Sequence, residues 1–199
     1  MKKLFSVLLL AVVLVVFTGC AQAHDHNHEE TTTTEQVIKT YVVTGSINGN
    51  TYTNDFAELT FKKPAAWTFL EGEALESLGG DSSVAIPDMA AVDGTTNSSV
   101  KLVFLNSFTI AGESITAKEY CDSTIKSAAS EGDMSAIVAE SEVTLGGNNY
   151  IKVVIEIADL NNPMTITHYV RAIDYYIVDI TTKTPSAKVS DTNFESMFS

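Results

Sequence analysis

The sequence is poor in positive charge. Its 199 residues include 12 Lys and Arg against 25 Asp and Glu, which gives a formal net charge of −13 at pH 7. Such a surface repels nucleic acid and anionic lipid headgroups, and no basic patch along the chain offsets that repulsion. We therefore expect no nucleic-acid partner.

Cysteine is equally scarce, since the chain has only Cys20 and Cys121. If Cys20 carries lipid, Cys121 has no partner within the chain and no intrachain disulfide can form. The folded part, about 160 residues, is long enough to bury roughly 70% of its unfolded surface. The fold must then depend on its core alone.

Recognisable catalytic motifs are also missing. The sequence contains no G-x-S-x-G elbow, no His-Glu-x-x-His, no P-loop and no dinucleotide fingerprint. Cys121 and His168 are the only candidates for a thiol nucleophile and its base, but Cys121 lies on the apolar face of a predicted helix and His168 alternates with apolar residues. Core packing explains both residues better, and we expect no enzyme activity and no cofactor.

What the sequence does contain is an export signal. Lys2 and Lys3 precede the apolar run from Leu4 to Phe17, which is too short for a permanent membrane span. The run ends in Thr18-Gly19-Cys20, which resembles a bacterial lipobox. Residues 1–19 are therefore predicted to be a lipoprotein signal peptide, and acylated Cys20 to hold the protein at the extracytoplasmic face of the bacterial cell membrane. A plain signal peptide cleaved after Ala21 or Ala23 is the alternative.

Residues 20–36 are predicted to form a flexible tether. They contain four consecutive threonines and no large hydrophobe, so they cannot bury enough surface to offset the entropy of ordering. Within them, His24, His26 and His28 form the only cluster of metal-ligand type, beside carboxylates that suit Zn²⁺. Weak Zn²⁺ binding by a solvated spacer and functional metal capture both remain open.

The sequence from residue 37 to 199 is predicted to form a single domain rich in strands. Asn48-Gly49 indicates a hairpin between Val37–Thr44 and Thr51–Thr53. Further strands are predicted in these segments: Phe56–Phe61, Val84–Val92, Val100–Asn106, Ala136–Leu145, Tyr150–Ala158, Met164–Ala172 and Tyr175–Thr182. Tight turns between neighbouring strands imply antiparallel pairing. The pattern predicts an α+β domain in which helices cover a mostly antiparallel sheet.

Three helices complete this pattern. Glu71–Leu78 is predicted as a short helix that ends at Gly79-Gly80, and a last short helix contains Phe194 and Phe198. The clearest signal lies between them, where Thr116 and Glu119 have the spacing of a capping box. That helix is predicted to run on towards Gly132.

Several segments together resemble small clostridial-type bacterial lipoproteins related to the PsbP-like fold. They are Tyr52–Phe61, Pro64–Trp67, Asp88–Asp93, Thr116–Tyr120, Gly146–Tyr150 and Tyr169–Thr182. The resemblance implies an α/β/α sandwich with an antiparallel central sheet. It also implies an accessory or binding subunit without enzyme activity.

Aromatic residues are the candidate contacts with a partner. Trp67 follows a proline near a strand end, and Tyr169, Tyr175 and Tyr176 lie on neighbouring predicted strands. Such side chains bring large contact areas to an interface, although they also form cores and strands. The leading hypothesis is a non-catalytic, lipid-anchored binding or accessory domain whose ligand or envelope-protein partner is unknown. The alternative is a metal-capture lipoprotein that uses the His24–His28 string.

A calorimetric titration with Zn²⁺ separates the two hypotheses. We expect Ala21–Ser199 and a variant with His24→Ala, His26→Ala and His28→Ala to bind Zn²⁺ equally weakly, because an unstructured site loses about 1–2 kcal/mol of backbone entropy per ordered residue. Stoichiometric, micromolar binding that disappears in the variant would instead favour metal capture.

Overall fold

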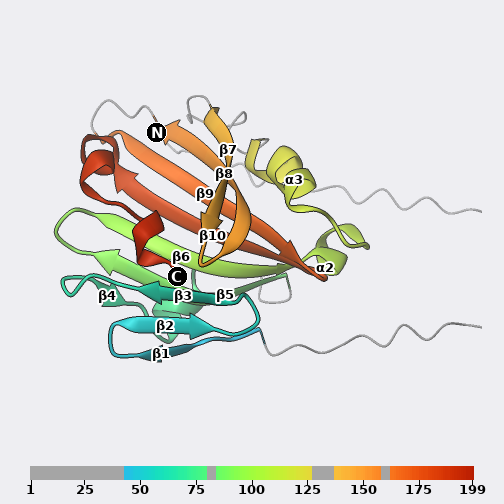
Figure 1. The fold of residues 1–199 in the computed structure, drawn as a ribbon, viewed down its shortest axis with the longest axis horizontal. Coiled ribbons are helices and arrows are strands. Elements are labelled where there is room, and N and C mark those ends of the chain that lie inside the picture. The colour runs from blue at the N-terminus through green and yellow to red at the C-terminus, as the bar shows by residue number, and fades with distance from the viewer. Residues whose placement is uncertain (1–42, 80–83, 127–136, 158–161) are drawn as a thin grey trace, which may run out of the picture. The chain divides into compact units, whose positions relative to one another are not determined.

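The computed structural model describes residues 43–79, 84–126, 137–157 and 162–199, which belong to a unit spanning Thr40–Ser199. Half of this part of the chain is β-strand, arranged in two sheets (Figure 1). The smaller sheet has the order β1–β2–β3 and the larger one has the order β4–β5–β6–β10–β9–β8–β7. Every neighbouring pair with a described register is antiparallel. The predicted α+β fold with a mostly antiparallel sheet is confirmed.

The strands of the small sheet are β1 (Ser46–Asn48), β2 (Thr51–Asn54) and β3 (Leu59–Lys62). Those of the large sheet are β4 (Thr68–Phe69), β5 (Ala85–Asp93), β6 (Ser98–Asn106), β7 (Ile137–Leu145), β8 (Asn148–Ile157), β9 (Met164–Ile173) and β10 (Tyr176–Pro185). Because the last strand, β10, pairs with β6, it joins the β5–β6 hairpin to the β7–β8–β9 meander.

The helices are short. They are α1 (Glu73–Glu76), α2 (Ser107–Ala111), α3 (Ala117–Tyr120), a π-helical turn (Cys121–Ile125) that continues α3, and 3-10 turns at Ser186–Asp191 and Glu195–Met197. The predicted capping box is confirmed, because the Thr116 hydroxyl accepts from the backbone N–H of Glu119 while the Glu119 carboxylate accepts from the backbone N–H of Thr116. The predicted end of this helix, near Gly132, lies outside the described residues.

The two faces of the large sheet are buried by different layers. Along β10, Val178 and Ile180 point to the small sheet, and the side chains of Ile177 and Asp179 point to α3. The first face, which we call the small-sheet face, packs on the three-stranded sheet and the C-terminal turn. The second, the α3 face, packs on α3 and its π-helical turn. One face of the sheet is therefore covered mainly by strands and the other by the helix.

The first hairpin forms with its turn one residue later than predicted. Asn48 pairs with Thr51, so the two-residue loop is Gly49-Asn50 and not Asn48-Gly49. Gly49 has φ of 60°. Positive φ at the first central residue alone is the requirement of a type II′ turn, whereas the predicted type I′ turn needs it at both.

A carboxylate of the large sheet holds the small sheet in place. Asp88 occupies a bulge in β5, between the paired residues Pro87 and Met89. Its Oδ2 accepts hydrogen bonds from the Gly45 backbone N–H at 2.8 Å, from Asn54 Nδ2 at 2.9 Å and from the Tyr52 hydroxyl. A Cβ on residue 45 would lie 2.4 Å from a backbone oxygen of β2, so only glycine fits there. Burial, together with the hydrogen bond to Asp88, raises the pKa of Tyr52 and keeps its hydroxyl a donor.

Replacement of Asp88 should therefore loosen the small sheet. Asp88→Ala leaves three donors without their acceptor, and each costs about 1–3 kcal/mol when buried, so we expect a loss of about 3 kcal/mol of unfolding free energy. Asp88→Asn keeps an acceptor oxygen and should cost about half as much. Urea denaturation measures both, with the exposed Asp55→Asn as a control expected to stay within about 0.5 kcal/mol of the parent. A parent-like Asp88→Ala would contradict the structural role of this carboxylate.

Candidate functional site

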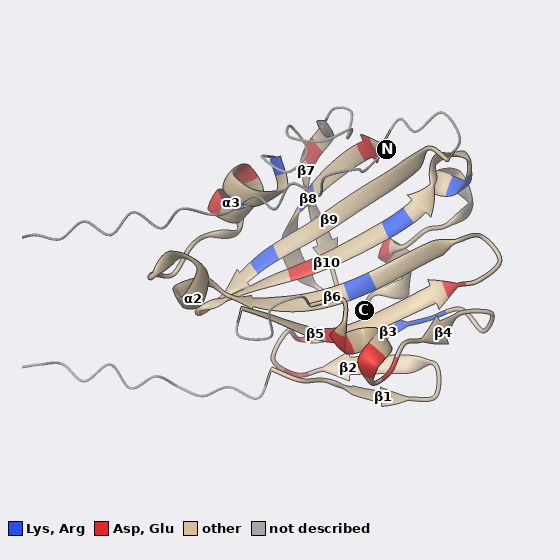
Figure 2. Ribbon diagram, turned by 180° about the vertical axis from the view of Figure 1, so that it is seen from behind, with Lys and Arg blue, Asp and Glu red and all other residues tan. Residues whose placement is uncertain are grey.

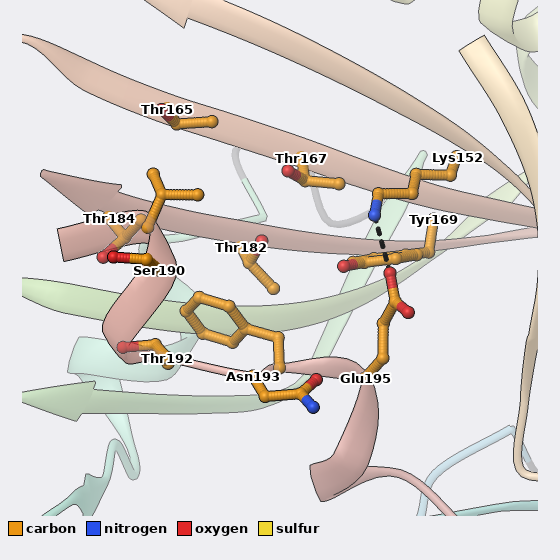
Figure 3. A pocket seen from close by; sticks show the side chains of 12 residues that line it. Lys152, Thr165, Thr167, Tyr169, Thr182, Thr184, Ser190, Thr192, Asn193 and Glu195 are labelled. Atoms are coloured by element: carbon orange, nitrogen blue, oxygen red, sulfur yellow. Dashed lines mark hydrogen bonds and ion pairs between the residues drawn. The ribbon is translucent and has the colours of Figure 1, made fainter. Parts of the chain in front are cut away.

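A pocket of about 380 Å³ lies between the small-sheet face and the C-terminal segment (Figure 3). One wall is formed by the ends of β9 and β10 together with Lys152 of β8, and the other by Val189, Ser190 and residues 192–195. Its lining residues are Lys152, Thr165, Thr167, Tyr169, Thr182, Thr184, Val189, Ser190, Thr192, Asn193, Phe194 and Glu195. The volume falls in the range of small-molecule sites, about 300–1,000 Å³.

The floor of the pocket is a double row of threonines. Thr167 pairs with Thr182 and Thr165 pairs with Thr184 across the β9–β10 ladder. Since side chains alternate along a strand, all four point to the face that Ile180 occupies further along β10. The apolar lining of this face thus changes to hydroxyl groups at one end of the sheet.

Only half of these hydroxyls have a protein partner. Thr184 shares a hydrogen bond of 2.6 Å with Ser98, and Thr165 one of 3.2 Å with Ser186. Within the described ranges, the hydroxyls of Thr167 and Thr182 make no side-chain hydrogen bond, although both residues are buried. Both residues line the pocket, where a ligand's hydroxyl groups can reach them.

An ion pair closes one side of the pocket. Lys152 Nζ lies 2.6 Å from Glu195 Oε1, as the dashed line in Figure 3 shows, and 5.8 Å from the centre of the Tyr169 ring. Both charged side chains are partly exposed, so the pair is worth little for stability. Burial, and then the charge of Glu195, raise the pKa of Tyr169, which keeps its hydroxyl neutral. Because the two charges of the lining neutralise each other, the pocket is polar without net charge.

The C-terminal wall of the pocket is anchored to the domain. Backbone hydrogen bonds of 2.8 and 2.9 Å connect Thr60 of β3 with Ser199. The Phe194 ring packs edge-to-face on Trp67, with 5.8 Å between the ring centroids. The wall therefore has a fixed position over the threonines.

A second polar cluster lies on the opposite, α3 face. His168 Nδ1 is 3.0 Å from Asp179 Oδ1, and the Tyr120 hydroxyl donates to Asp179 Oδ2 at 3.2 Å. The Thr181 hydroxyl donates to the same carboxylate at 3.2 Å. These bonds satisfy a buried carboxylate and tie α3 to the sheet.

Cys121 lies beside this cluster but is not an activated nucleophile. Its side chain is fully buried in the apolar cluster under α3. Burial, and then the negative charge of Asp179, raise the pKa of the Cys121 thiol to about 11. Nucleophilic cysteines require the opposite shift, because the thiolate is the reactive form.

The predicted aromatic contacts have four different environments. Trp67 is buried in the core against Phe194, and Tyr169 is buried beneath Lys152 in the pocket wall. Tyr176 is half-buried and packs edge-to-face on Phe56. Tyr175 alone of the four is exposed.

The predicted lipidation and metal-binding residues, Cys20, His24, His26 and His28, lie outside the described residues. Among the residues that are described, no group of three or more His, Cys, Asp or Glu side chains is arranged to hold a metal ion. No helix in the same residues is long and apolar enough to cross a membrane.

The pocket threonines were not predicted from the sequence. Their signal was the alternation Thr165-x-Thr167 and Thr182-x-Thr184, on two strands that were both predicted. Threonine is common in strands, so this pattern alone does not distinguish a pocket from an ordinary strand surface. The pairing of His168 with Asp179 depends on the β9–β10 register, which the sequence left open.

Comparison with known proteins gives likenesses of architecture only. No protein-family model matches the chain, and no curated protein matches its sequence. Among solved structures, cyanobacterial PsbP (CyanoP) from Synechocystis is similar with 12% identity and a TM-score of 0.48, covering 81% of this chain and 95% of its own. LpqN of Mycobacterium tuberculosis, involved in cell envelope biogenesis, is similar with 11% identity and a TM-score of 0.48, covering 71% and 82%. A protein from Bacteroides thetaiotaomicron matches with 12% identity and a TM-score of 0.41, covering 77% and 48%.

The protonation state of the Cys121 thiol can be tested directly. At pH 8 a thiol with a pKa of about 11 has roughly a hundredfold less thiolate than one at the ordinary value of 9.0. In a Cys20→Ser chain we therefore expect iodoacetamide to react with folded Cys121 at least a hundredfold more slowly than with the urea-unfolded chain. The raised pKa also contributes stability that is complete below pH 9 and is lost as the pH rises towards 11. Equal alkylation rates in the two states would restore Cys121 and His168 as a candidate pair.

Proposed function

We propose that this protein is a non-catalytic, extracytoplasmic accessory domain, anchored through acylated Cys20, that binds a neutral, hydroxyl-rich small molecule in the threonine pocket. A sugar unit of an envelope glycan has the chemistry that this pocket recognises. The single observation that carries the proposal is that Thr167 and Thr182, both buried residues, line a pocket of about 380 Å³ while their hydroxyls make no side-chain hydrogen bond within the described part of the chain.

Threonine hydroxyls select the class of ligand. Each one both donates and accepts a hydrogen bond, and therefore complements the alternating donors and acceptors of a polyol or sugar. The pocket adds the Asn193 side chain, which offers both functions, and the aromatic side chains of Tyr169 and Phe194. A buried polar group left unpaired costs free energy, so a ligand that pairs both hydroxyls is favoured over an apolar one.

Electrostatics oppose anionic ligands. Lys152 is neutralised by Glu195, so the pocket offers no unpaired cation for a phosphate or carboxylate. The net charge of −13 disfavours the approach of anions still further. Neutral sugars should accordingly bind better than their phosphorylated or acidic counterparts.

Conservative removal of two hydroxyls tests this proposal. We expect calorimetric titration with neutral mono- and disaccharides, including N-acetylglucosamine, to detect a saturable site. Thr167→Val with Thr182→Val preserves shape and should weaken binding of the detected sugar by roughly thirtyfold, since each lost hydrogen bond contributes about 1 kcal/mol.

Thr53→Val is the matched control, because Thr53 lies exposed on β2, away from the pocket. Its affinity for the same sugar should equal that of the parent. The proposal fails if no neutral sugar binds, or if the double variant binds as tightly as the parent. Preferential binding of sugar phosphates would also contradict it.

A further inference from the structure

Exposed apolar side chains gather at one end of the domain. Of the six large hydrophobic residues that are exposed in the described chain, three belong to α2 or to the β9–β10 turn beside it, and two of these, Phe108 and Tyr175, are in contact. They are Phe108, 53% exposed, Ile110, 43%, and Tyr175, 38%. We call these three residues the apolar tip. The sequence of α2, Ser107–Ala111, contains no charged residue, and Figure 2 shows it without charge colouring.

The apolar tip is held rigidly. The Ser107 backbone N–H and its hydroxyl both donate to the Tyr175 carbonyl at 2.8 Å. The Phe108 and Tyr175 rings meet edge-to-face, with 6.2 Å between their centroids. Asn106 caps the start of α2 by accepting from the Phe108 N–H. The exposed side chains are therefore presented on a fixed support, which lowers the entropy lost on contact with another surface.

The described chain begins at this same end of the domain. The Val43 carbonyl accepts from Asn54 Nδ2 at 2.7 Å, and Phe56, two residues further on, packs on Tyr176 beside the apolar tip. Gly45 is bonded to Asp88, which lies about four residues from the α2 end of the β5–β6 ladder. Figure 1 shows the first described residues and α2 at the same side of the sheets. The segment that leads back to Cys20 therefore joins the domain at the end that carries the apolar tip.

We propose that the apolar tip inserts into the outer surface of the lipid bilayer in which Cys20 is anchored. The proposal rests on the lipid anchor of the proposed function. Aromatic and aliphatic side chains on a short uncharged helix are suited to the boundary between headgroups and acyl chains. The contact would fix the orientation of the domain on the membrane and not merely its distance.

The charge of the protein decides which lipid the apolar tip prefers. Glu113 and Asp174 lie in the turns that flank it, and the whole chain is strongly acidic. Anionic headgroups should therefore weaken the contact and zwitterionic ones should allow it. This preference is the reverse of that shown by basic membrane-binding helices.

A weak contact is sufficient because the anchor keeps the apolar tip close to the bilayer. Twenty-two residues separate Cys20 from Val43, and even fully extended they span no more than about 75 Å. Confinement within such a distance corresponds to a local concentration on the order of millimolar. Three apolar side chains then contact the membrane for much of the time, although a free domain would hardly bind vesicles.

Quenching by brominated lipid detects the insertion. The full lipidated chain is reconstituted into phosphatidylcholine vesicles with bromine on the acyl chains, and Phe108→Trp reports on the apolar tip. The parent, whose one tryptophan, Trp67, is buried, provides the baseline. We expect at least a twofold quenching of the Phe108→Trp signal, lost when Ile110→Ser and Tyr175→Ser are added and reduced by anionic phosphatidylglycerol.

Thr95→Trp is the matched control, because Thr95 is exposed in the β5–β6 turn at the opposite end of the sheet. Its fluorescence should not be quenched. Equal quenching at residues 95 and 108, or none at either, would overturn the proposal. Sedimentation that shows a dimer dependent on Phe108 would overturn it as well, because the apolar tip would then be a contact between copies of this chain.

Flotation of the chain with vesicles tests the anchor separately. A chain that floats but shows no quenching contradicts the inserted tip and leaves the anchor intact. A chain that does not float contradicts natural acylation of Cys20. In that case a Cys121→Ser chain that begins at Cys20 is produced without acylation and coupled through Cys20 to a maleimide lipid, so that the same quenching measurement decides on the apolar tip.

Discussion

The arrangement of the two sheets depends on the hydrogen bonds that the Asp88 carboxylate accepts. It lies at a bulge, where the β5 ladder skips one residue, and one of its oxygens accepts from Gly45, Tyr52 and Asn54 of the small sheet. These bonds place the small sheet over the large one and enclose the core between them. Asn54 then uses its remaining groups on the Val43 carbonyl and the Ala57 N–H, so one polar network fixes both where the chain enters the domain and how it turns into β3. A bulged residue is suited to this task because it makes no ladder pair of its own.

The two faces of the large sheet use polar groups differently. On the α3 face, Asp179 is satisfied by His168, Tyr120 and Thr181, and the result is a cross-link between helix and sheet. On the small-sheet face, Thr167 and Thr182 are buried but left open to a pocket. Satisfied polar groups stabilise a fold, whereas accessible groups without a partner are available to a ligand. This difference is why we assign binding to the threonine pocket and a structural role to the histidine cluster.

Local signals in the sequence predicted local structure well, and tertiary features poorly. The capping box of Thr116 and Glu119 and the long strands formed as expected, because their causes lie within a few residues. The turn at Gly49 formed one residue later, since the pairing of Asn48 with Thr51 decides which residues occupy the loop. The small helix α2 was missed although Asn106 and Gly112 bracket it with a cap at each end. The pocket was missed for a different reason: it requires the register of β9 with β10 and the path of the C-terminal segment, neither of which is encoded nearby in the chain.

The strands β9 and β10 relate the two proposed surfaces to each other. The apolar tip lies at the turn that joins these strands, and the pocket threonines lie six to eight residues along β10 from Tyr176. At about 3.3 Å per residue, the separation is roughly 20–26 Å. A domain standing on its apolar tip would therefore open its pocket above the headgroup layer, towards the material that surrounds the membrane and not towards its lipid. Because both surfaces are built on β9 and β10, the sheet itself fixes the distance between them. The orientation of the domain at the membrane would then determine which molecules the pocket meets.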